Sequence, residues 1–293
     1  MTEPGKNKEL EALITLIDEP DETIYHKIRE RILSYGKEAV PYLEKAWEVN
    51  VQPLAQKRIE ILLHKMQFAA LYDDLNNWYS LGGNNLLMGY LLVSKFQYPS
   101  LDEEKIRKEL DRIKKDIWLE LNSELTAFEK VNLVNNILFT ENKFEAVKHD
   151  DRNPLYYYLN NLLETRKGNH LSLAMLYQII ASQAELPVFG VDLPDHFILA
   201  YMKEMAGMPD KDLSGGWVFF YIDPYHKGDL LGKGIIDAFL KSHKYDQNNQ
   251  YYYRPCTNIA IIKRLLNELF DTYKEVGNAV KCDELSVLLT IFK

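Results

Sequence analysis

The chain has 293 residues, of which 46% are hydrophobic and 27% charged, a composition that is typical of a folded globular protein and excludes a disordered or fibrous one. The 35 basic and 43 acidic residues give a formal net charge of −8. A chain this acidic is repelled by phosphate backbones, and no basic stripe offsets the repulsion, so we expect no nucleic-acid partner.

The cysteines and the N-terminus indicate the compartment. Cys256 and Cys282 are too few for a disulfide framework, and they lack the short paired spacing of a zinc site. The segment Met1 to Glu11 carries charges where a signal peptide needs an apolar run, and no stretch approaches the roughly 18 apolar residues of a membrane span. We therefore expect a cytoplasmic protein without a membrane partner, and no motif indicates a cofactor.

Residues 1–67 predict short helices joined by tight turns. Apolar residues recur at helical spacing from Leu10 to Gln67, and Asp18–Asp21 and Gly36 interrupt them. The turn "DEPD", followed by a helix, a glycine and "AVPYL", resembles a HEAT-like repeat. A plain helical bundle is the alternative.

The pattern stays helical up to Asp150 and then changes. A second helix that is apolar almost all round is predicted to begin at His170, after a turn at Gly168. The runs "PVFGVDLPDHFILAYM" and "GGWVFFYIDPY" are rich in β-branched and aromatic residues and predict strands, which we expect to pair antiparallel. Lys203 to Gly216 is polar and predicts a surface loop, and Thr257 to Lys293 predicts a helical hairpin.

The central motifs resemble a known family. The helix that begins at His170, then "ELPVFGVDLPDHFILAY" and "FFYIDPYHKGDLL", resembles the transglutaminase-like superfamily and, within it, the bacterial SirB-type family. The stretches "NNLLETRKGN" and "LAMLY" fit as well, and the tail looks like a tetratricopeptide-type hairpin. The resemblance extends from about Leu71 to the C-terminus.

This resemblance implies an α+β fold in which a papain-like core packs a buried helix on a small antiparallel sheet, with helical extensions at both ends. The expected domains are a helical, HEAT-like region over 1–67, a transglutaminase-like core with its helical lead-in over 68–255, and a tetratricopeptide-like hairpin over 256–293.

In such folds a Cys opens the helix, a His begins the next strand and an Asp ends the strand after that. The resemblance assigns His196 to the catalytic His and Asp223 to the orienting Asp. Aligning Glu185-Leu186-Pro187 on the superfamily's Gly-Ile-Pro puts His170 at the position of the Cys. An imidazole cannot replace a thiolate that the helix dipole and an imidazolium activate.

Four alternatives remain for the site. Ser172 would complete a Ser-His-Asp set, but it lies two residues past His170, a rotation of roughly 200° on a helix, and so is expected to face away. Cys256 could act as a displaced nucleophile, since triads are recognised by geometry. His170 and His196 could hold a metal with Asp223 behind them, if His226 or Asp195 supplied a third ligand. His196 and Asp223 could also simply hold two strands in register.

Two functional hypotheses follow. The first is a transglutaminase-like protein without the nucleophilic Cys, which is non-catalytic and binds a protein partner through its cleft or its helical repeats. The second is a hydrolase or amide-transfer enzyme that uses His196 and Asp223 with Ser172, a water or a metal. An open groove beside a bonded His196–Asp223 pair, with Ser172, a water or an ion within reach, would favour chemistry, and a groove filled by His170 or a neighbouring aromatic would favour a remnant. Glu164 and Arg166, which precede the turn at Gly168, are interpreted as a structural ion pair.

Overall fold

The computed structural model describes residues 4–148, 151–203 and 218–293, which form two compact units, Met1–Asn76 and Asn77–Lys293. Each unit is described by itself. Within the described ranges, no helix combines the length and the apolar character that a membrane crossing requires.

The first unit consists of helices. These are α1 (Pro4–Thr15), α2 (Glu22–Leu33), α3 (Val40–Val49) and most of α4 (Pro53–Ser80). The helices predicted from the apolar spacing are confirmed, and α4 continues well past residue 67. Asp21 caps α2, because its side chain accepts hydrogen bonds from the backbone N–H groups of Thr23 and Ile24.

A buried arginine ties α4 to the turn between α1 and α2. Arg58 donates to the carbonyl oxygens of Ile17 and Glu19 at 3.0 and 2.7 Å, and to the carboxylate of Glu22 at 2.7 Å. Its guanidinium also lies 3.6 Å from the ring centroid of Tyr25. One side chain of α4, Arg58, therefore supplies hydrogen-bond donors to carbonyl oxygens in the turn "DEPD" and just before it.

The second unit combines helices with two sheets. Its further helices are α5 (Leu86–Gln97), α6 (Glu103–Glu120), α7 (Ala127–Asn135), α8 (Leu159–Thr165), α9 (His170–Gln183), α10 (Lys233–Ser242), α11 (Asn258–Glu275) and α12 (Ala279–Leu289). Short 3-10 helices span Gly36–Ala39 in the first unit and Pro154–Tyr157, Pro224–His226, Gln250–Tyr253 and Thr290–Phe292 in the second, and a π-helical segment, Asn136–Glu141, follows α7.

The larger sheet is antiparallel, in the order β3-β4-β5-β6. Its strands are β3 (Val188–Leu193), β4 (His196–Met202), β5 (Val218–Asp223) and β6 (Asp229–Leu231), and a separate parallel pair joins β1 (Glu145–Ala146) to β2 (Lys167–Gly168). The run "PVFGVDLPDHFILAYM" contains both β3 and β4, because the chain reverses at Asp195, whose φ is +56°. The loop predicted from Lys203 to Gly216 lies, apart from Lys203, outside the described residues.

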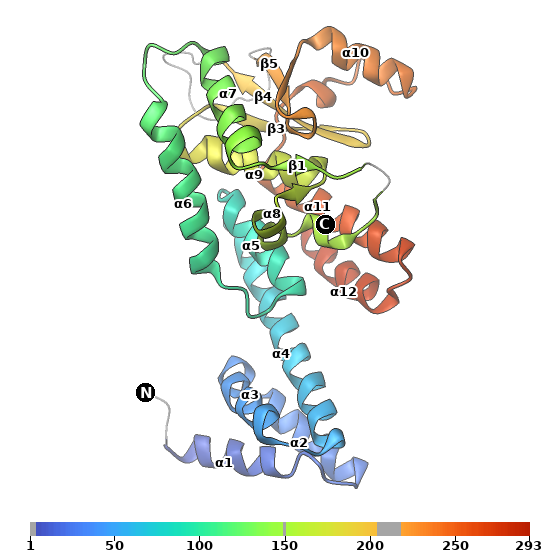
Figure 1. Ribbon diagram of the computed structural model, residues 1–293. Helices are drawn as coiled ribbons and strands as arrows, with labels where there is room; N and C mark the ends of the chain where they lie inside the picture. Colours follow the sequence, from blue (N-terminus) through green and yellow to red (C-terminus); the bar gives the residue numbers. More distant parts are fainter. Residues whose placement is uncertain (1–3, 149–150, 204–217) are drawn as a thin grey trace. The chain divides into compact units, whose positions relative to one another are not determined.

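Helix α9 is enclosed by the rest of its unit. Every residue from Leu171 to Ala181 is buried, and the helix packs against β3, β4, α6 and α8 (Figure 1). The apolar side chains of α10 cover one face of the sheet. Helices α11 and α12 form the predicted hairpin, and α11 packs on α5. The predicted α+β fold, a buried helix on a small antiparallel sheet with helical extensions, is confirmed.

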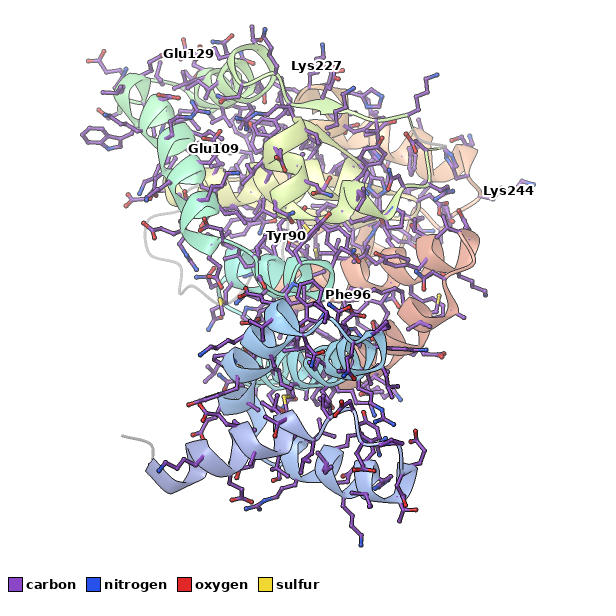
Figure 2. The ribbon with its side chains drawn as sticks, turned by 60° about the horizontal axis from the view of Figure 1, so that its bottom comes forward. Tyr90, Phe96, Glu109, Glu129, Lys227 and Lys244 are labelled. Atoms are coloured by element: carbon purple, nitrogen blue, oxygen red, sulfur yellow. The ribbon has the colours of Figure 1, made fainter. Side chains whose placement is uncertain are left out.

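An ion pair supports the turn that leads into α9. Arg166 ends α8 with a left-handed φ of +61° and pairs with Glu109 of α6, which is labelled in Figure 2. Glu109 also pairs with Arg112 at 2.9 Å. Arg166 thus forms a structural ion pair as expected, but its partner is Glu109, while Glu164 is exposed. Hydrogen bonds from Arg112 and Arg166 lower the pKa of Glu109 from 4.5 to about 2, although burial opposes them.

We expect Glu109→Gln to lower the free energy of unfolding by about 1 kcal/mol at neutral pH, because the carboxylate is only partly shielded from solvent. A depressed pKa in the folded state means that the ionised group stabilises the fold above pH 4.5 and that this contribution is lost as the pH falls toward 2. The difference between wild type and variant in chemical denaturation should therefore shrink across that window. Asp111→Asn, an exposed substitution on the same helix, is the control. A difference that does not change with pH would contradict the assignment.

Candidate functional site

The second unit contains an open cavity of about 990 Å³. Its wall is built from the start of α9, the start of β4, the end of β5, the 3-10 helix Pro224–His226, α10 and α11. The polar side chains that line it are Lys148, Asp151, Arg152, Tyr157, Asn169, His170, Asp195, His196, Asp223, Tyr225, His226, Asp229, His243, Arg264, Glu268, Asp271 and Thr272. His170, His196 and Asp223 are among them, and the cavity remains open beside them.

His196 and Asp223 are hydrogen-bonded. His196 is the first residue of β4 and Asp223 the last of β5, and because these strands are antiparallel neighbours the two side chains meet. His196 Nε2 lies 3.0 Å from Asp223 Oδ2. The other carboxylate oxygen, Oδ1, accepts a hydrogen bond from the backbone N–H of Tyr225 at 3.1 Å. The carboxylate is therefore held in one orientation, with Oδ2 toward the imidazole.

A second imidazole shares the same oxygen. His226 closes the 3-10 helix after Asp223, and its Nδ1 lies 2.8 Å from Asp223 Oδ2. The sequence suggested His226 only as a possible third metal ligand. The sequence "IDPYH" could have indicated the contact between His226 and Asp223, because a proline after Asp223 favours a tight turn that brings residues three apart close together.

Asp223 is buried and ionised. Burial by itself would raise the pKa of Asp223, but the hydrogen bonds and positive charge of His196 and His226 outweigh it, and the pKa is lowered. The carboxylate therefore acts as a hydrogen-bond acceptor shared by two imidazoles.

His170 lies beside this group at the start of α9. Its ring centroid is 5.5 Å from that of His196. Its Nε2 lies 3.6 Å from Glu268 Oε2, and Glu268 in turn pairs with Arg264 at 2.7 Å. Burial raises the pKa of Glu268, although Arg264 opposes the shift. Since Glu268 is 98 residues further along the chain, no local pattern could have indicated this contact.

Ser172 and the two thiols lie away from the cavity wall. Ser172 is fully buried, and its Oγ donates to the carbonyl oxygen of Asn169 at 3.2 Å. The backbone N–H of Cys256 bonds Gly190, and burial raises the pKa of the Cys256 thiol to about 12. Cys282 lies within the C-terminal hairpin, where its Sγ is 3.7 Å from the carbonyl oxygen of Phe270. None of the three lines the cavity.

Among the residues that the structure describes, one group of side chains has the spacing of metal ligands. The ligand atoms of His196, Asp223 and His226 all lie within 4.8 Å of one another. Asp195, the other possible third ligand, lines the cavity but accepts a hydrogen bond from the hydroxyl of Tyr245 at 3.0 Å. His170 is not part of this group.

A family model described as the transglutaminase-like superfamily matches residues 104–267. The chain belongs to this superfamily. The matched span runs from α6 into α11 and includes His170, His196 and Asp223, so the cavity is the cavity of a transglutaminase-like domain.

Curated relatives fall into two groups. F-box only protein 21 of Mus musculus is 29% identical over 125 residues, which cover 43% of this chain but only 18% of that protein. The UPF0162 protein of Xylella fastidiosa (strain 9a5c) is 26% identical over 209 residues, covering 67% of this chain and 69% of the relative. The UPF0162 protein YchA of Escherichia coli (strain K12) is 24% identical over 174 residues, 59% of each chain. No solved structure matches.

We expect Asp223→Asn to destabilise this transglutaminase-like domain by about 1–3 kcal/mol, because the amide has one acceptor oxygen where the carboxylate uses two, so its NH2 group would face either the imidazoles or the backbone N–H of Tyr225. His226→Gln should cost less than about 0.5 kcal/mol, since that imidazole is largely exposed. Chemical denaturation in the presence of a chelator measures both. Equal effects of the two substitutions would mean that Asp223 does not organise the site.

Proposed function

We propose that the protein is a SirB-type transglutaminase-like protein that lacks the nucleophilic Cys, is non-catalytic, and binds a protein partner in its cavity. The observation that carries this proposal is the imidazole of His170 at the start of α9, with its ring centroid 5.5 Å from that of His196. In the superfamily resemblance, this is the position of the thiol.

The chemistry of a thiol triad explains why this substitution matters. The start of a helix stabilises a thiolate, and the neighbouring imidazolium lets it attack at neutral pH. An imidazole at that position forms no such pair. Ser172, Cys256 and Cys282 lie outside the cavity wall, so His196 has no hydroxyl or thiol from this set within reach. His196 and Asp223 then serve to build a polar cavity wall.

The charge of the cavity indicates the chemistry of the partner. Asp195, Asp229 and Asp271 are exposed on the wall, whereas the guanidinium of Arg264 is already paired with Asp192 and Glu268. Lys148 and Arg152 contribute positive charge at one side, and Arg152 lies 3.4 Å from Glu275. Because acidic groups prevail, a lysine- or arginine-rich segment of a protein fits best.

We also assign a role in partner binding to the helical extensions. We expect the HEAT-like region over 1–67 and the tetratricopeptide-like hairpin over 256–293 to add partner-binding surface, since helical repeats present extended faces to proteins. A cytoplasmic location fits the two unpaired cysteines.

The alternative, an enzyme that uses His196 and Asp223 with a water or a metal, has two observations in its favour. The cavity beside the hydrogen-bonded pair is open, and His226 adds a second imidazole to Asp223. Ser172 contributes nothing to this alternative, because it is fully buried away from the cavity.

We expect His170→Cys to create a reactive thiol, because the new side chain would lie at a helix start beside an imidazole. A thiol pKa lowered from about 8.5 to about 7 raises the thiolate fraction at neutral pH roughly tenfold. Mass spectrometry after iodoacetamide treatment would compare residue 170 with Cys256 and Cys282. The His170→Cys, His196→Ala double variant is the control and should lose the enhancement. A thiol at 170 that reacts no faster in the presence of His196 would contradict the assigned position.

We expect purified protein to show no turnover of amide or ester substrates that depends on His196, because no thiol adjoins it. Wild type and His196→Ala should have the same background rate. Turnover that disappears in His196→Ala would overturn the non-catalytic assignment.

The same preparation should bind fluorescent lysine- and arginine-rich peptides in preference to glutamate-rich ones. Reversing two exposed charges of the wall, in Asp229→Lys with Asp271→Lys, should weaken binding about tenfold, which corresponds to about 1.4 kcal/mol. Asp111→Lys with Glu120→Lys, two exposed reversals on α6 away from the cavity wall, changes the net charge by the same amount and is the control. Fluorescence anisotropy measures the affinity. Equal losses in the wall and control variants would mean that the cavity is not the binding site.

A further inference from the structure

Two imidazoles of the cavity wall converge on one carboxylate oxygen. Asp223 Oδ2 lies 3.0 Å from His196 Nε2 and 2.8 Å from His226 Nδ1. The three atoms lie within 4.8 Å of one another. We propose that His196, Asp223 and His226 form a binding site for a first-row divalent metal ion, of which Zn²⁺ is the representative probe.

The spacing of the three atoms suits a coordination sphere. Zinc binds imidazole nitrogen and carboxylate oxygen at about 2.0–2.2 Å, so two ligands of a tetrahedral ion lie roughly 3.4 Å apart. The two distances from Asp223 Oδ2 are 3.0 and 2.8 Å, so side-chain shifts of about 0.5 Å bring the ligands to that spacing. An ion at this point would replace the two protons that now bridge the imidazoles to the carboxylate.

The ligand types select the class of ion. Two imidazole nitrogens and one carboxylate oxygen form a borderline set, which prefers first-row transition ions and zinc over the harder magnesium and calcium. The single negative charge of Asp223 offsets half the charge of a divalent ion. Asp229 of β6 lies opposite Asp223 of β5 in the sheet, and both line the cavity. This concentration of negative charge further favours a cation.

The ligands are held in position before any ion arrives. The backbone N–H of Tyr225 binds Asp223 Oδ1, which leaves Oδ2 directed at the imidazoles. The hydroxyl of Tyr225 donates to the carbonyl oxygen of Val147 at 2.7 Å and so anchors the 3-10 helix that carries His226. The ring of Tyr225 also packs edge-on against His196 at 5.8 Å between centroids. Such support from neighbouring groups is what gives a metal site its affinity.

The site would leave coordination positions open. All three ligands line the cavity, so the remaining positions of the ion face it. Three protein ligands with an open position are typical of zinc sites that contact a substrate or a water rather than of closed structural sites. In this protein the open position would take a water or a carbonyl or carboxylate oxygen of a bound molecule. The metal site does not require that the cavity bind a protein partner.

The test is titration of chelator-treated full-length protein with Zn²⁺ by calorimetry, and with Co²⁺ by visible absorption. We expect one ion per chain, and for Co²⁺ an absorption band that reports nitrogen and oxygen ligation. His226→Ala removes one ligand and should weaken binding at least about 100-fold, since loss of even an outer partner of a ligand costs 10–100-fold. His226 is largely exposed, so this variant should keep the wild-type fold, which far-UV circular dichroism verifies.

His243→Ala is the matched control. His243 is an exposed imidazole that lines the same cavity but lies outside the ligand group, and its Nδ1 lies 2.9 Å from the carbonyl oxygen of Phe239. Its loss should leave the Zn²⁺ affinity unchanged. The proposal is overturned if wild type binds no ion at micromolar concentrations. It is equally overturned if His226→Ala binds as tightly as wild type, or if His243→Ala loses as much affinity as His226→Ala.

Discussion

The burial of α9 on all sides is the constraint on which the rest of the domain depends. Because residues Leu171 to Ala181 are all covered, the helix cannot rotate or slide, and its first residue has one possible position. The strands β3 and β4 and the 3-10 helix Pro224–His226 pack on it. The start of the helix, the start of β4 and the end of β5 therefore meet at one cavity, although His170 and Asp223 are 53 residues apart.

Around this cavity the electrostatics favour positive charge. Asp223 stays ionised in spite of its burial because two imidazoles bond it, and the exposed acidic residues of the wall add to the same field. A basic peptide and a divalent cation are both compatible with this field, and they differ in what they require. A peptide requires the open volume of the cavity, whereas a metal ion requires only the ligand atoms of His196, Asp223 and His226. The two proposals can therefore hold together or separately.

Ion pairs outside the cavity and within its wall support this arrangement. Arg166, in a left-handed conformation, connects the turn before α9 to Glu109 on α6, and its guanidinium lies 4.7 Å from the ring centroid of Phe144. On the other side, Glu268 and Arg264 of α11 lie behind His170. These contacts connect α6 and α11, which are far apart in sequence, to the start of α9. They therefore help to hold His170 in place.

Local patterns in the sequence were enough to place most of the helices and strands. Apolar periodicity located most of the helices and the all-buried character of α9, and the β-branched runs located β3, β4 and β5, whereas α10, β6 and the β1–β2 pair were not predicted. The family motifs selected His170, His196 and Asp223. Only the packed fold shows that His196 of β4 shares Asp223 Oδ2 with the neighbouring His226, that Arg166 pairs with Glu109 instead of Glu164, and that His170 contacts Glu268. The physical reason is that periodicity, caps and turns act over a few neighbouring residues, whereas these contacts exist only once distant elements have packed together.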